Sequence, residues 1–470
     1  MYETVVGIEV HVELKSNSKV FSHSQNEYST EPNLYVNEID LGYPGVLPVL
    51  NKKVIEMALQ ASLALNCKIN KVMHFDRKNY FYPDLPKGYQ ITEQDTPIGY
   101  DGYIDIGDKK IGIERLHIEE DTCKSIHGKR GTMLDANRAG VPLIEIVSKP
   151  DMRSPEDAVK YLTKLREILL YLGISDVKIE EGSMRCDCNV SIHKPGTPLG
   201  TKIEIKNIGS INNVGEAIKY EIKRQSEILD NGDKIEHEET RRLDDKTMTT
   251  ILMRVKETGN DYRYFPEPDI PYVELSDDWI NDVKANMPVF ADELKEKYKN
   301  LGINDNNIKT IIGRLDLCQF LESVIDSVDP VTASNLLTGD ILSYLNKNYV
   351  SINKIKLNKD NFSELVNDIT GGKISSKQAK ELVPYLIENG GSVKDAVDTL
   401  GLNEITDTNA LNDIVKRVLD SNPESIKDYN DGKDRAIKYL MGQIMKETGG
   451  KANPAIASQI LMSLIKDYKL

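Results

Sequence analysis

Residues 4–14 read TVVGIEVHVEL, and apolar and polar side chains alternate along this segment. Successive side chains of a β-strand point to opposite faces of a sheet, so this period of two predicts a strand. One face would carry apolar side chains such as Ile8 and Val10, and the other would carry Glu9 and His11. Such clean alternation is typical of a sheet that buries one face only, and sheets of that kind are usually antiparallel.

The same alternation returns at 185–192 and 202–206, which predicts two further strands. Helices are expected between the strands, at about 52–65, 154–172 and 214–229. The helix at 154–172 has a clear start and stop, because it begins with Ser-Pro and is followed by Gly.

From about residue 276 the strand pattern is replaced by helix-length segments that glycines separate. We therefore predict an α+β protein with three domains. A mainly antiparallel-sheet domain would occupy residues 1–275, an all-helical domain 276–405, and a small helical tail domain 406–470.

The composition indicates a soluble globular chain. It has 470 residues, of which 39% are apolar and 29% charged, and its formal net charge is −14. No apolar run approaches the roughly 20 residues that a membrane span needs, and no signal peptide is recognisable, so no membrane association is expected. Five cysteines without regular spacing do not form a disulfide framework. We expect a cytoplasmic protein.

The negative net charge argues against non-specific binding of nucleic acid, which needs a basic surface. The end of the chain differs, because residues 432–470 contain seven basic residues and three acidic ones. By charge alone, an ordinary solvated helical surface and an RNA-binding surface are equally good interpretations. The candidate RNA contacts are Lys433, Arg435, Lys438, Lys446 and Lys451.

Common nucleotide and hydrolase motifs are absent. The sequence has no G-x-x-x-x-G-K-[ST] phosphate loop, no G-x-G-x-x-G after the first strand and no G-x-S-x-G. Any phosphate chemistry must therefore use a different scaffold.

Acidic residues and histidine gather on the polar faces of the expected strands. Glu9 and His11 lie two residues apart, so their side chains share a face. The sequence HIEED at 117–121 adds further acids, and Glu145 lies inside the apolar run LIEIV, where an unpaired charge would be costly. Arg185 and Asp187 lie on a further strand. Carboxylates suit Mg²⁺, which also takes ligands from phosphate, so a metal–phosphate site is favoured over a solvated sheet face with charge pairs.

Two loops have similar sequences, DRKNYFYPDLP at 76–86 and DYRYFPEPDIP at 261–271. Each combines basic side chains with aromatic rings and prolines, which would suit a base or a sugar phosphate. Aromatic packing under a stiff turn is the slightly preferred interpretation.

Cys186 and Cys188 have a spacing that occurs in zinc sites, but both lie on the apolar face of their strand, and the other cysteines are scattered. We expect buried, inert thiols.

Long ordered segments of the chain resemble the B subunits of the tRNA-dependent amidotransferases. The segments that carry the resemblance are VGIEVHVEL at 6–14, DLGYPGVLPV at 40–49, FDRKNYFYPDLPKGYQI at 75–91, RLHIEED at 115–121, DANRAGVPLIEIV at 135–147, EEGSMRCDCN at 180–189, DYRYFPEPD at 261–269 and YLMGQIMK at 439–446 with KANP at 451–454. The resemblance covers essentially the whole length.

The resemblance implies a cradle-shaped kinase domain, then a helical domain and a tail that contacts tRNA. It implies ATP and Mg²⁺ as cofactors. As partners it implies a larger amidase-type glutaminase chain (the A chain), a small third chain (the C chain) and misacylated tRNA. In that family the B chain phosphorylates the side-chain carboxylate of Glu-tRNA(Gln) or Asp-tRNA(Asn), and ammonia from the A chain then makes the amide. Some relatives carry a four-cysteine zinc cluster that this sequence lacks, so no zinc is expected.

Carried over by motif, the resemblance implies that Glu9, His11 and Glu120 hold the metal, with Glu119, Glu145 and Asp187 as further candidates. We expect Arg185 and Lys78 to contact phosphate, on charge and motif position. The candidate catalytic set is thus Glu9, His11, Glu119, Glu120 and Arg185.

Two other functions stay open. The chain could be a non-catalytic scaffold that binds tRNA within the same complex, or a free-standing ATP-dependent amide ligase for a small acid. The basic tail argues against the ligase. So does the lack of a glutaminase nucleophile, because Tyr2 and not cysteine follows Met1.

Overall fold

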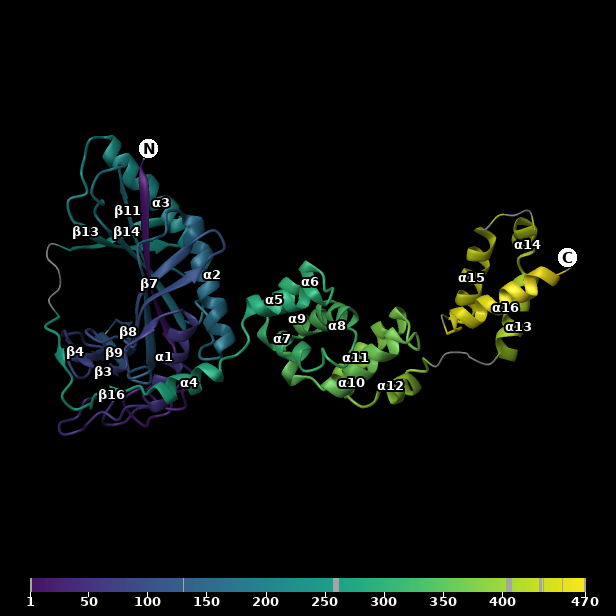
Figure 1. Cartoon of the computed structure of the whole chain (residues 1–470), viewed down its shortest axis with the longest axis horizontal. Helices are drawn as coiled ribbons and strands as arrows, with labels where there is room; N and C mark the ends of the chain where they lie inside the picture. Colours follow the sequence, from purple (N-terminus) through teal and green to yellow (C-terminus); the bar gives the residue numbers. More distant parts are fainter. Residues whose placement is uncertain are drawn as a thin grey trace. The chain divides into compact units, whose positions relative to one another are not determined.

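The computed structural model describes residues 2–129, 131–256, 262–402, 408–430, 433, 435–449 and 451–468. The chain divides into two compact units, Met1–Leu294 and Lys295–Leu470. The predicted α+β class is confirmed, because strands fill much of the first unit and the described part of the second is helical (Figure 1). The domain boundaries near 275 and 405 stay a prediction.

A nine-stranded sheet forms the centre of the first unit (Figure 1). Its strands lie in the order β14 (Thr249–Lys256), β13 (Glu238–Asp244), β12 (Ile203–Lys206), β11 (Met184–His193), β1 (Glu3–Glu13), β10 (Pro142–Ser148), β7 (Lys110–Glu120), β6 (Gly99–Asp105) and β2 (Lys68–Ile69). Neighbouring strands are antiparallel except β12 and β13, which are parallel and are joined by a helical crossover, α3 (Ile211–Asp230). The predicted antiparallel character and the three predicted strands are confirmed.

The two faces of this sheet differ as the alternation predicted. In β1 the side chains of Ile8, Val10 and Val12 are buried, whereas Glu9 and His11 are half-buried on the opposite face. Helices α1 (Lys52–Ala64), α2 (Pro155–Leu172) and α3 pack on the apolar face and share one core with it. The polar face is left available for chemistry.

The predicted helix ends also agree with the structure. Ser154 accepts a hydrogen bond from the backbone N–H of Asp157 at the start of α2, and Gly173 ends the helix with φ of 70°. Helix α3 begins at Ile211, three residues earlier than predicted, because the side chain of Ser210 caps it through the N–H of Asn213.

The two loops with similar sequences pair with each other. Strand β4 (Asp76–Asn79) lies between β5 (Tyr89–Thr92) and β15 (Phe265–Pro266), and Phe265 is opposite Arg77. Two further small sheets join β3 (Val72–Met73) with β16 (Val273–Glu274) and β8 (Lys124–Gly128) with β9 (Gly131–Asp135). Helix α4 (Asp277–Ala285) follows them and packs on α1.

The second unit consists of helices. Its described elements are most of α5 (Ala291–Asn300), then α6 (Asp305–Ile312), α7 (Leu315–Glu322), α8 (Pro330–Leu336), a π-helical turn (Leu337–Ile341), α9 (Leu342–Asn348), a 3₁₀ turn (Ile352–Lys354), α10 (Lys359–Thr370), α11 (Ser376–Asn389), α12 (Val393–Thr399), α13 (Thr408–Asp420), α14 (Pro423–Asn430), α15 (Arg435–Glu447) and α16 (Pro454–Asp467). The last four share an apolar core, and Asn453 caps α16 as predicted. Within the described ranges, no helix combines the length and apolar character that a membrane crossing requires.

The thiols of Cys186 and Cys188 are buried on the apolar face of β11, as expected. Burial, together with the charge of Asp187, raises the pKa of Cys186 to about 12, so this thiol stays protonated near neutral pH.

A carboxyl group is buried where the sheet loses a strand. β6 ends its pairing with β7 at Leu116, and the side chain of Glu93 takes over beyond that point. Its Oε2 accepts hydrogen bonds from the N–H of Ile98 at 3.0 Å and of Ile118 at 3.2 Å, while its buried Oε1 has no partner among the described residues. Burial raises the pKa of Glu93 to about 8, so the folded state favours the protonated acid.

We therefore expect Glu93→Gln to stabilise the first unit more at pH 8.5 than at pH 5. Because the pKa of Glu93 in the folded state exceeds the unfolded value, the wild-type chain loses stability as the pH rises toward about 8, and glutamine removes that loss. The fluorescence of Trp279, the one tryptophan of the chain, reports urea unfolding of this unit. The exposed Glu274→Gln is the control, and an equal gain at both pH values would contradict the prediction.

Candidate active site

The registers of three central strands bring the predicted acids and imidazoles together. His11 on β1 lies opposite Glu145 on β10, and Glu145 lies opposite His117 on β7. On the other side of β1, His11 lies opposite Arg185 on β11. Directly opposite residues of antiparallel strands point to the same face, so these side chains converge on the polar face of the sheet.

His11, Glu119 and Glu145 form the tightest group. The Nε2 atom of His11 lies 3.1 Å from Oε1 of Glu119 and 3.6 Å from Oε2 of Glu145. One ligand atom from each residue lies within 4.8 Å of the other two. Both carboxylates are buried, with side chains 4% and 12% exposed. We call these three residues the central cluster.

The charges of the central cluster depend on one another. Burial would lower the pKa of His11, but the hydrogen bond and charge of Glu119 and the charge of Glu145 raise it to about 9. Burial would raise the pKa of Glu145, but His117, His11 and Lys78 hold it well below its ordinary value. The carboxylates therefore stay ionised, and they need positive charge beside them.

The central cluster has the donor set of a divalent-cation site. Two buried carboxylates offer the oxygen ligands that hard cations prefer, and His11 adds an imidazole nitrogen. A bound cation would supply the positive charge that the proton on His11 supplies otherwise. His117 contacts Glu145 at 3.1 Å, and its buried Nδ1 has no hydrogen-bond partner among the described residues.

Glu9 and Asp187 share the polar face but lie outside the central cluster. Oε1 of Glu9 accepts a hydrogen bond from Nδ2 of Asn189 at 2.9 Å. Burial and the charge of Glu145 raise the pKa of Glu9. Asp187 forms an ion pair with Lys206, which also contacts Glu204 at 3.0 Å. Both predicted ligands are therefore close to the cluster and bound to other side chains.

Glu120 is not brought to the central cluster. It follows Glu119 on β7, so its side chain points to the opposite face of the strand. There its Oε1 accepts from Nζ of Lys87 at 2.5 Å and from the N–H of Ile91 at 2.9 Å. Sequence reasoning ranked Glu120 above Glu119 as a ligand, whereas Glu119 is the one that contacts His11.

His117 was missed as a candidate. It contacts both carboxylates of the central cluster, at 3.1 Å to Glu145 and 3.9 Å to Glu119. The signal was present in the sequence, because His117 and Glu119 have the same two-residue spacing as Glu9 and His11.

A cavity of about 540 Å³ opens beside the central cluster. Lys78, Arg185 and Lys206 lie on its wall, together with Tyr80. Nη2 of Arg185 donates to Asp121 at 2.7 Å, while its buried Nε has no partner among the described residues. Nζ of Lys78 lies 4.9 Å from the ring of Tyr262, and Lys78 forms no ion pair among the described residues. The two predicted phosphate contacts thus lie at one cavity, which offers charge for an anion.

The paired loops build one wall of this cavity. Arg77 donates to both carboxylate oxygens of Glu267, at 2.6 and 3.0 Å, and so joins β4 to the segment after β15. The N–H of Asn79 donates to the carbonyl of Tyr262 at 2.9 Å. Asp261, which begins the second loop, lies outside the described residues. The wall is therefore assembled from two distant parts of the sequence.

The candidate RNA contacts lie in the second unit, and all are exposed: Lys433, Arg435, Lys438, Lys446 and Lys451. Arg435, Lys438 and Lys446 fall within roughly 80° of the circumference of α15. The buried side chains of α15, such as Leu440 and Ile444, lie on the other side. The helix therefore presents a basic stripe, although Nζ of Lys433 pairs with Asp428 at 2.7 Å.

Comparison with known proteins gives the family. The model of the GatB/GatE catalytic domain matches residues 4–281, and that of the GatB domain matches residues 319–465. Three similar relatives are each named as the B chain of an aspartyl/glutamyl-tRNA(Asn/Gln) amidotransferase. They come from Enterococcus faecalis (48% identity over 98% of both chains), Limosilactobacillus reuteri (49%, 99% of both) and Geobacillus thermodenitrificans (47%, 99% of both).

Replacing a carboxylate of the central cluster should weaken cation binding. We expect Glu119→Gln or Glu145→Gln to lower the affinity of the full chain for Mn²⁺ by about 10-fold or more, because each removes a charged oxygen ligand. Electron paramagnetic resonance of free Mn²⁺ during titration measures this. Glu120→Gln is the matched control on the opposite face and should change the affinity by less than about 2-fold. Equal losses at 119 and 120 would contradict this assignment.

Proposed function

The chain belongs to the GatB/GatE family, and on that premise we propose that it is the B chain of a tRNA-dependent amidotransferase. It converts the side-chain carboxylate of misacylated Glu-tRNA(Gln) or Asp-tRNA(Asn) into an amide, which gives Gln-tRNA(Gln) or Asn-tRNA(Asn) for translation in the cytoplasm. The observation that carries the proposal is the convergence of His11, Glu119 and Glu145 beside a cavity with cationic walls.

The reaction needs ATP because a carboxylate is a poor acylating agent. An oxygen of the side-chain carboxylate attacks the γ-phosphorus of ATP, and ADP leaves. Ammonia then attacks the carbonyl carbon of the acyl phosphate, phosphate leaves with that oxygen, and the nitrogen loses a proton to give the neutral amide. Phosphoryl transfer depends on neutralisation of charge more than on a protein nucleophile, which agrees with a site of ionic side chains.

The residues at the cavity have separate tasks in this proposal. The ammonium of Lys78 and the guanidinium of Arg185 neutralise phosphate oxygens and orient them. His11, Glu119 and Glu145 would hold Mg²⁺, with Glu9 and Asp187 close by. When bound, the ion would supply positive charge for phosphate oxygens. Zinc is not expected.

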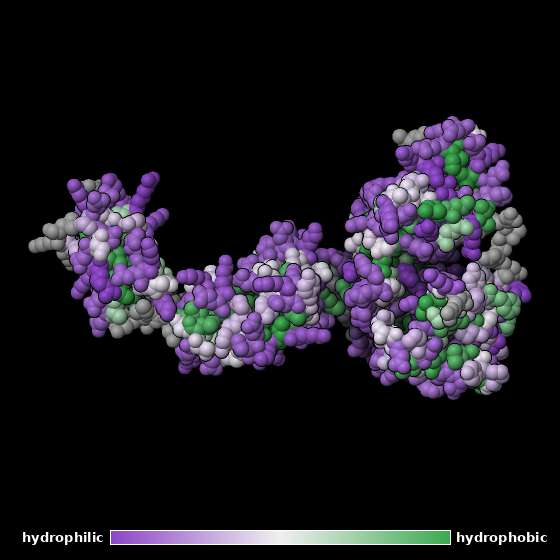
Figure 2. Space-filling view, turned by 180° about the vertical axis from the view of Figure 1, so that it is seen from behind, coloured by the Kyte–Doolittle hydropathy of each residue, from purple (hydrophilic) through white to green (hydrophobic). Residues whose placement is uncertain are grey.

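The chain needs partners that supply ammonia. We propose an amidase-type glutaminase, the A chain, which releases ammonia from glutamine, and a small C chain. The surface supports association with other proteins, because large apolar side chains are exposed, such as Phe81 at 85% and Leu47 at 60%. Figure 2 shows apolar patches on the first unit within a surface that is otherwise mainly hydrophilic.

The two other functions predict different results. A scaffold protein would leave amidation unchanged when the central cluster is altered. A free-standing ligase would turn over ATP with free glutamate and ammonium in the absence of tRNA.

His11→Ala in the reconstituted three-chain complex tests the catalytic role. We expect ATP-dependent amidation of Glu-tRNA(Gln) to fall by roughly 100-fold or more, because the substitution removes a member of the charge-neutralising cluster. Glutaminase activity and tRNA affinity should persist. His127→Ala, an exposed histidine on β8, is the control. Unchanged amidation in His11→Ala would favour the scaffold function.

The basic stripe of α15 is proposed to contact the tRNA. Phosphate contacts made by lysine release counterions, so their contribution falls as the salt concentration rises.

Lys438→Glu with Lys446→Glu should therefore weaken tRNA binding by about 10-fold at low salt, and the effect should shrink at high salt. Fluorescence anisotropy of labelled tRNA measures the affinity. Lys427→Glu with Lys416→Glu, elsewhere in the four-helix tail, makes the same change of net charge and should have a smaller effect. Equal effects of the two pairs would show that only net charge matters.

A further inference from the structure

The polar face of the sheet continues from the central cluster toward the edge strand β14. Asn189 bridges toward Glu9, and on the next strands Glu204 accepts a hydrogen bond from Oγ1 of Thr240 at 2.9 Å. Thr240 in turn accepts from Nε of Arg254 at 3.4 Å. A row of polar contacts therefore runs along one face from β1 to β14.

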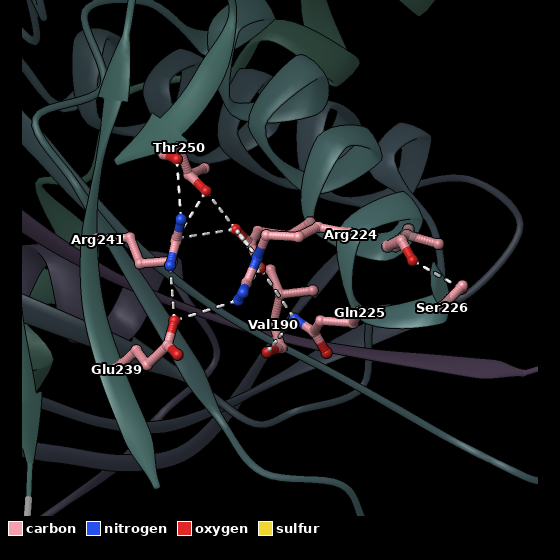
Figure 3. Close-up of polar contacts among 9 residues, drawn as sticks. Val190, Arg224, Gln225, Ser226, Glu239, Arg241 and Thr250 are labelled. Atoms are coloured by element: carbon pink, nitrogen blue, oxygen red, sulfur yellow. Dashed lines mark hydrogen bonds and ion pairs between the residues drawn. The ribbon is translucent and has the colours of Figure 1, made fainter. Parts of the chain in front are cut away.

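A buried network fixes which side chains of β13 face this row (Figure 3). Arg241 points to α3, where it contacts the fully buried Glu221 at 3.3 Å and Glu239 at 2.7 Å. Arg224 of α3 joins the same two carboxylates at 3.0 and 3.2 Å. The network clamps the β13–β14 hairpin onto the helix.

Since Arg241 is held on the helix side, its neighbour Arg242 must point to the polar face. Arg242 is exposed and lies opposite Ile251 of β14, which is 38% exposed. Arg254 lies opposite Thr240, two residues from Arg242 on the same face. The guanidinium of Arg242 has no ion pair or hydrogen bond with any described residue, and that of Arg254 contacts only the Thr240 hydroxyl.

This pair of guanidinium groups differs from the cations at the cavity. Lys206 is neutralised by Asp187 and Glu204, and Arg185 contacts Asp121. Arg242 and Arg254 lack a carboxylate among the described residues, in a chain whose net charge is −14. Two uncompensated positive charges beside an exposed apolar side chain suit a phosphodiester backbone with unpaired bases, which combine negative charge with apolar ring faces.

We propose that Arg242 and Arg254, with Ile251, bind the unpaired 3′ end of the aminoacyl-tRNA and guide its last residue to the central cluster. This rests on the proposed function. Three strand spacings separate β1 from β13, about 14 Å at roughly 4.8 Å per strand. A short run of unpaired nucleotides spans that distance, so the aminoacyl group reaches the central cluster while phosphates lie on the arginines.

The test uses the reconstituted complex with Arg242→Ala and Arg254→Ala combined. We expect the KM for aminoacyl-tRNA to rise about 10-fold, while kcat and the KM for ATP stay unchanged, because the pair contacts RNA and not the nucleotide. The dependence of log affinity on log salt should become shallower by about 1.4, the value for two phosphates of a single strand. Arg242→Lys with Arg254→Lys keeps the charge and should restore most of the affinity.

A trimmed tRNA identifies the part of the RNA that is bound. Anisotropy should show that the alanine variant loses affinity for intact tRNA but binds tRNA without its unpaired 3′ nucleotides as the wild type does. Lys223→Ala, on the outer side of α3, is the control for charge and should affect neither RNA. Equal losses for intact and trimmed tRNA, or no loss for either, would overturn the inference.

Two further outcomes separate this inference from the proposed function. If the arginine variant separates from its partner chains in size-exclusion chromatography, the pair binds protein and the inference is wrong. If the wild-type complex does not amidate, the proposed function fails, and the comparison of intact with trimmed tRNA still decides whether the arginines bind the 3′ end.

Discussion

The pairing of β1 with β10 on one side and β11 on the other is the constraint on which the site depends. Because side chains alternate along each strand, one register decides at once that Ile8, Val10 and Val12 enter the core and that Glu9 and His11 leave it. A shift of one residue would bury the charges and expose the apolar set. The free energy of burying the apolar face therefore also holds the acids in place, and the position of the site follows from the packing of α1, α2 and α3 on the other side.

Electrostatics then narrows what this arrangement can do. Buried carboxylates are stable only beside positive charge, and His11, His117 and Lys78 provide it around Glu119 and Glu145. Each of these contacts exchanges readily for a cation or for substrate phosphate, because none is enclosed within the apolar core. The site differs in this respect from the Glu221 network, where both arginines are held by carboxylates and their positions are fixed. One group of charges is arranged for exchange, and the other for rigidity.

Much of this fold was predictable because alternation and helix caps are local signals. The strand at 4–14, the helix at 154–172 and the burial of Cys186 follow from neighbours in the sequence. The site was less predictable, because its contacts depend on register between strands. In HIEED the two adjacent glutamates must point to opposite faces, and only the pairing with β10 shows that Glu119 joins His11 while Glu120 meets Lys87. The similarity of the loops at 76–86 and 261–271 was visible, but nothing local indicated that they pair.

That pairing has a consequence for biosynthesis. Arg77 and Glu267 are 190 residues apart, so the strand that completes the wall beside Lys78 leaves the ribosome long after β4 has been made. Chains are synthesised from the amino terminus, and a nascent chain that ends before β15 already contains every residue of the central cluster but lacks this wall. The order of translation thus delays assembly of the cavity until the first unit is almost entirely synthesised, and a prematurely terminated product keeps the acids and imidazoles without the enclosure that would organise a nucleotide around them.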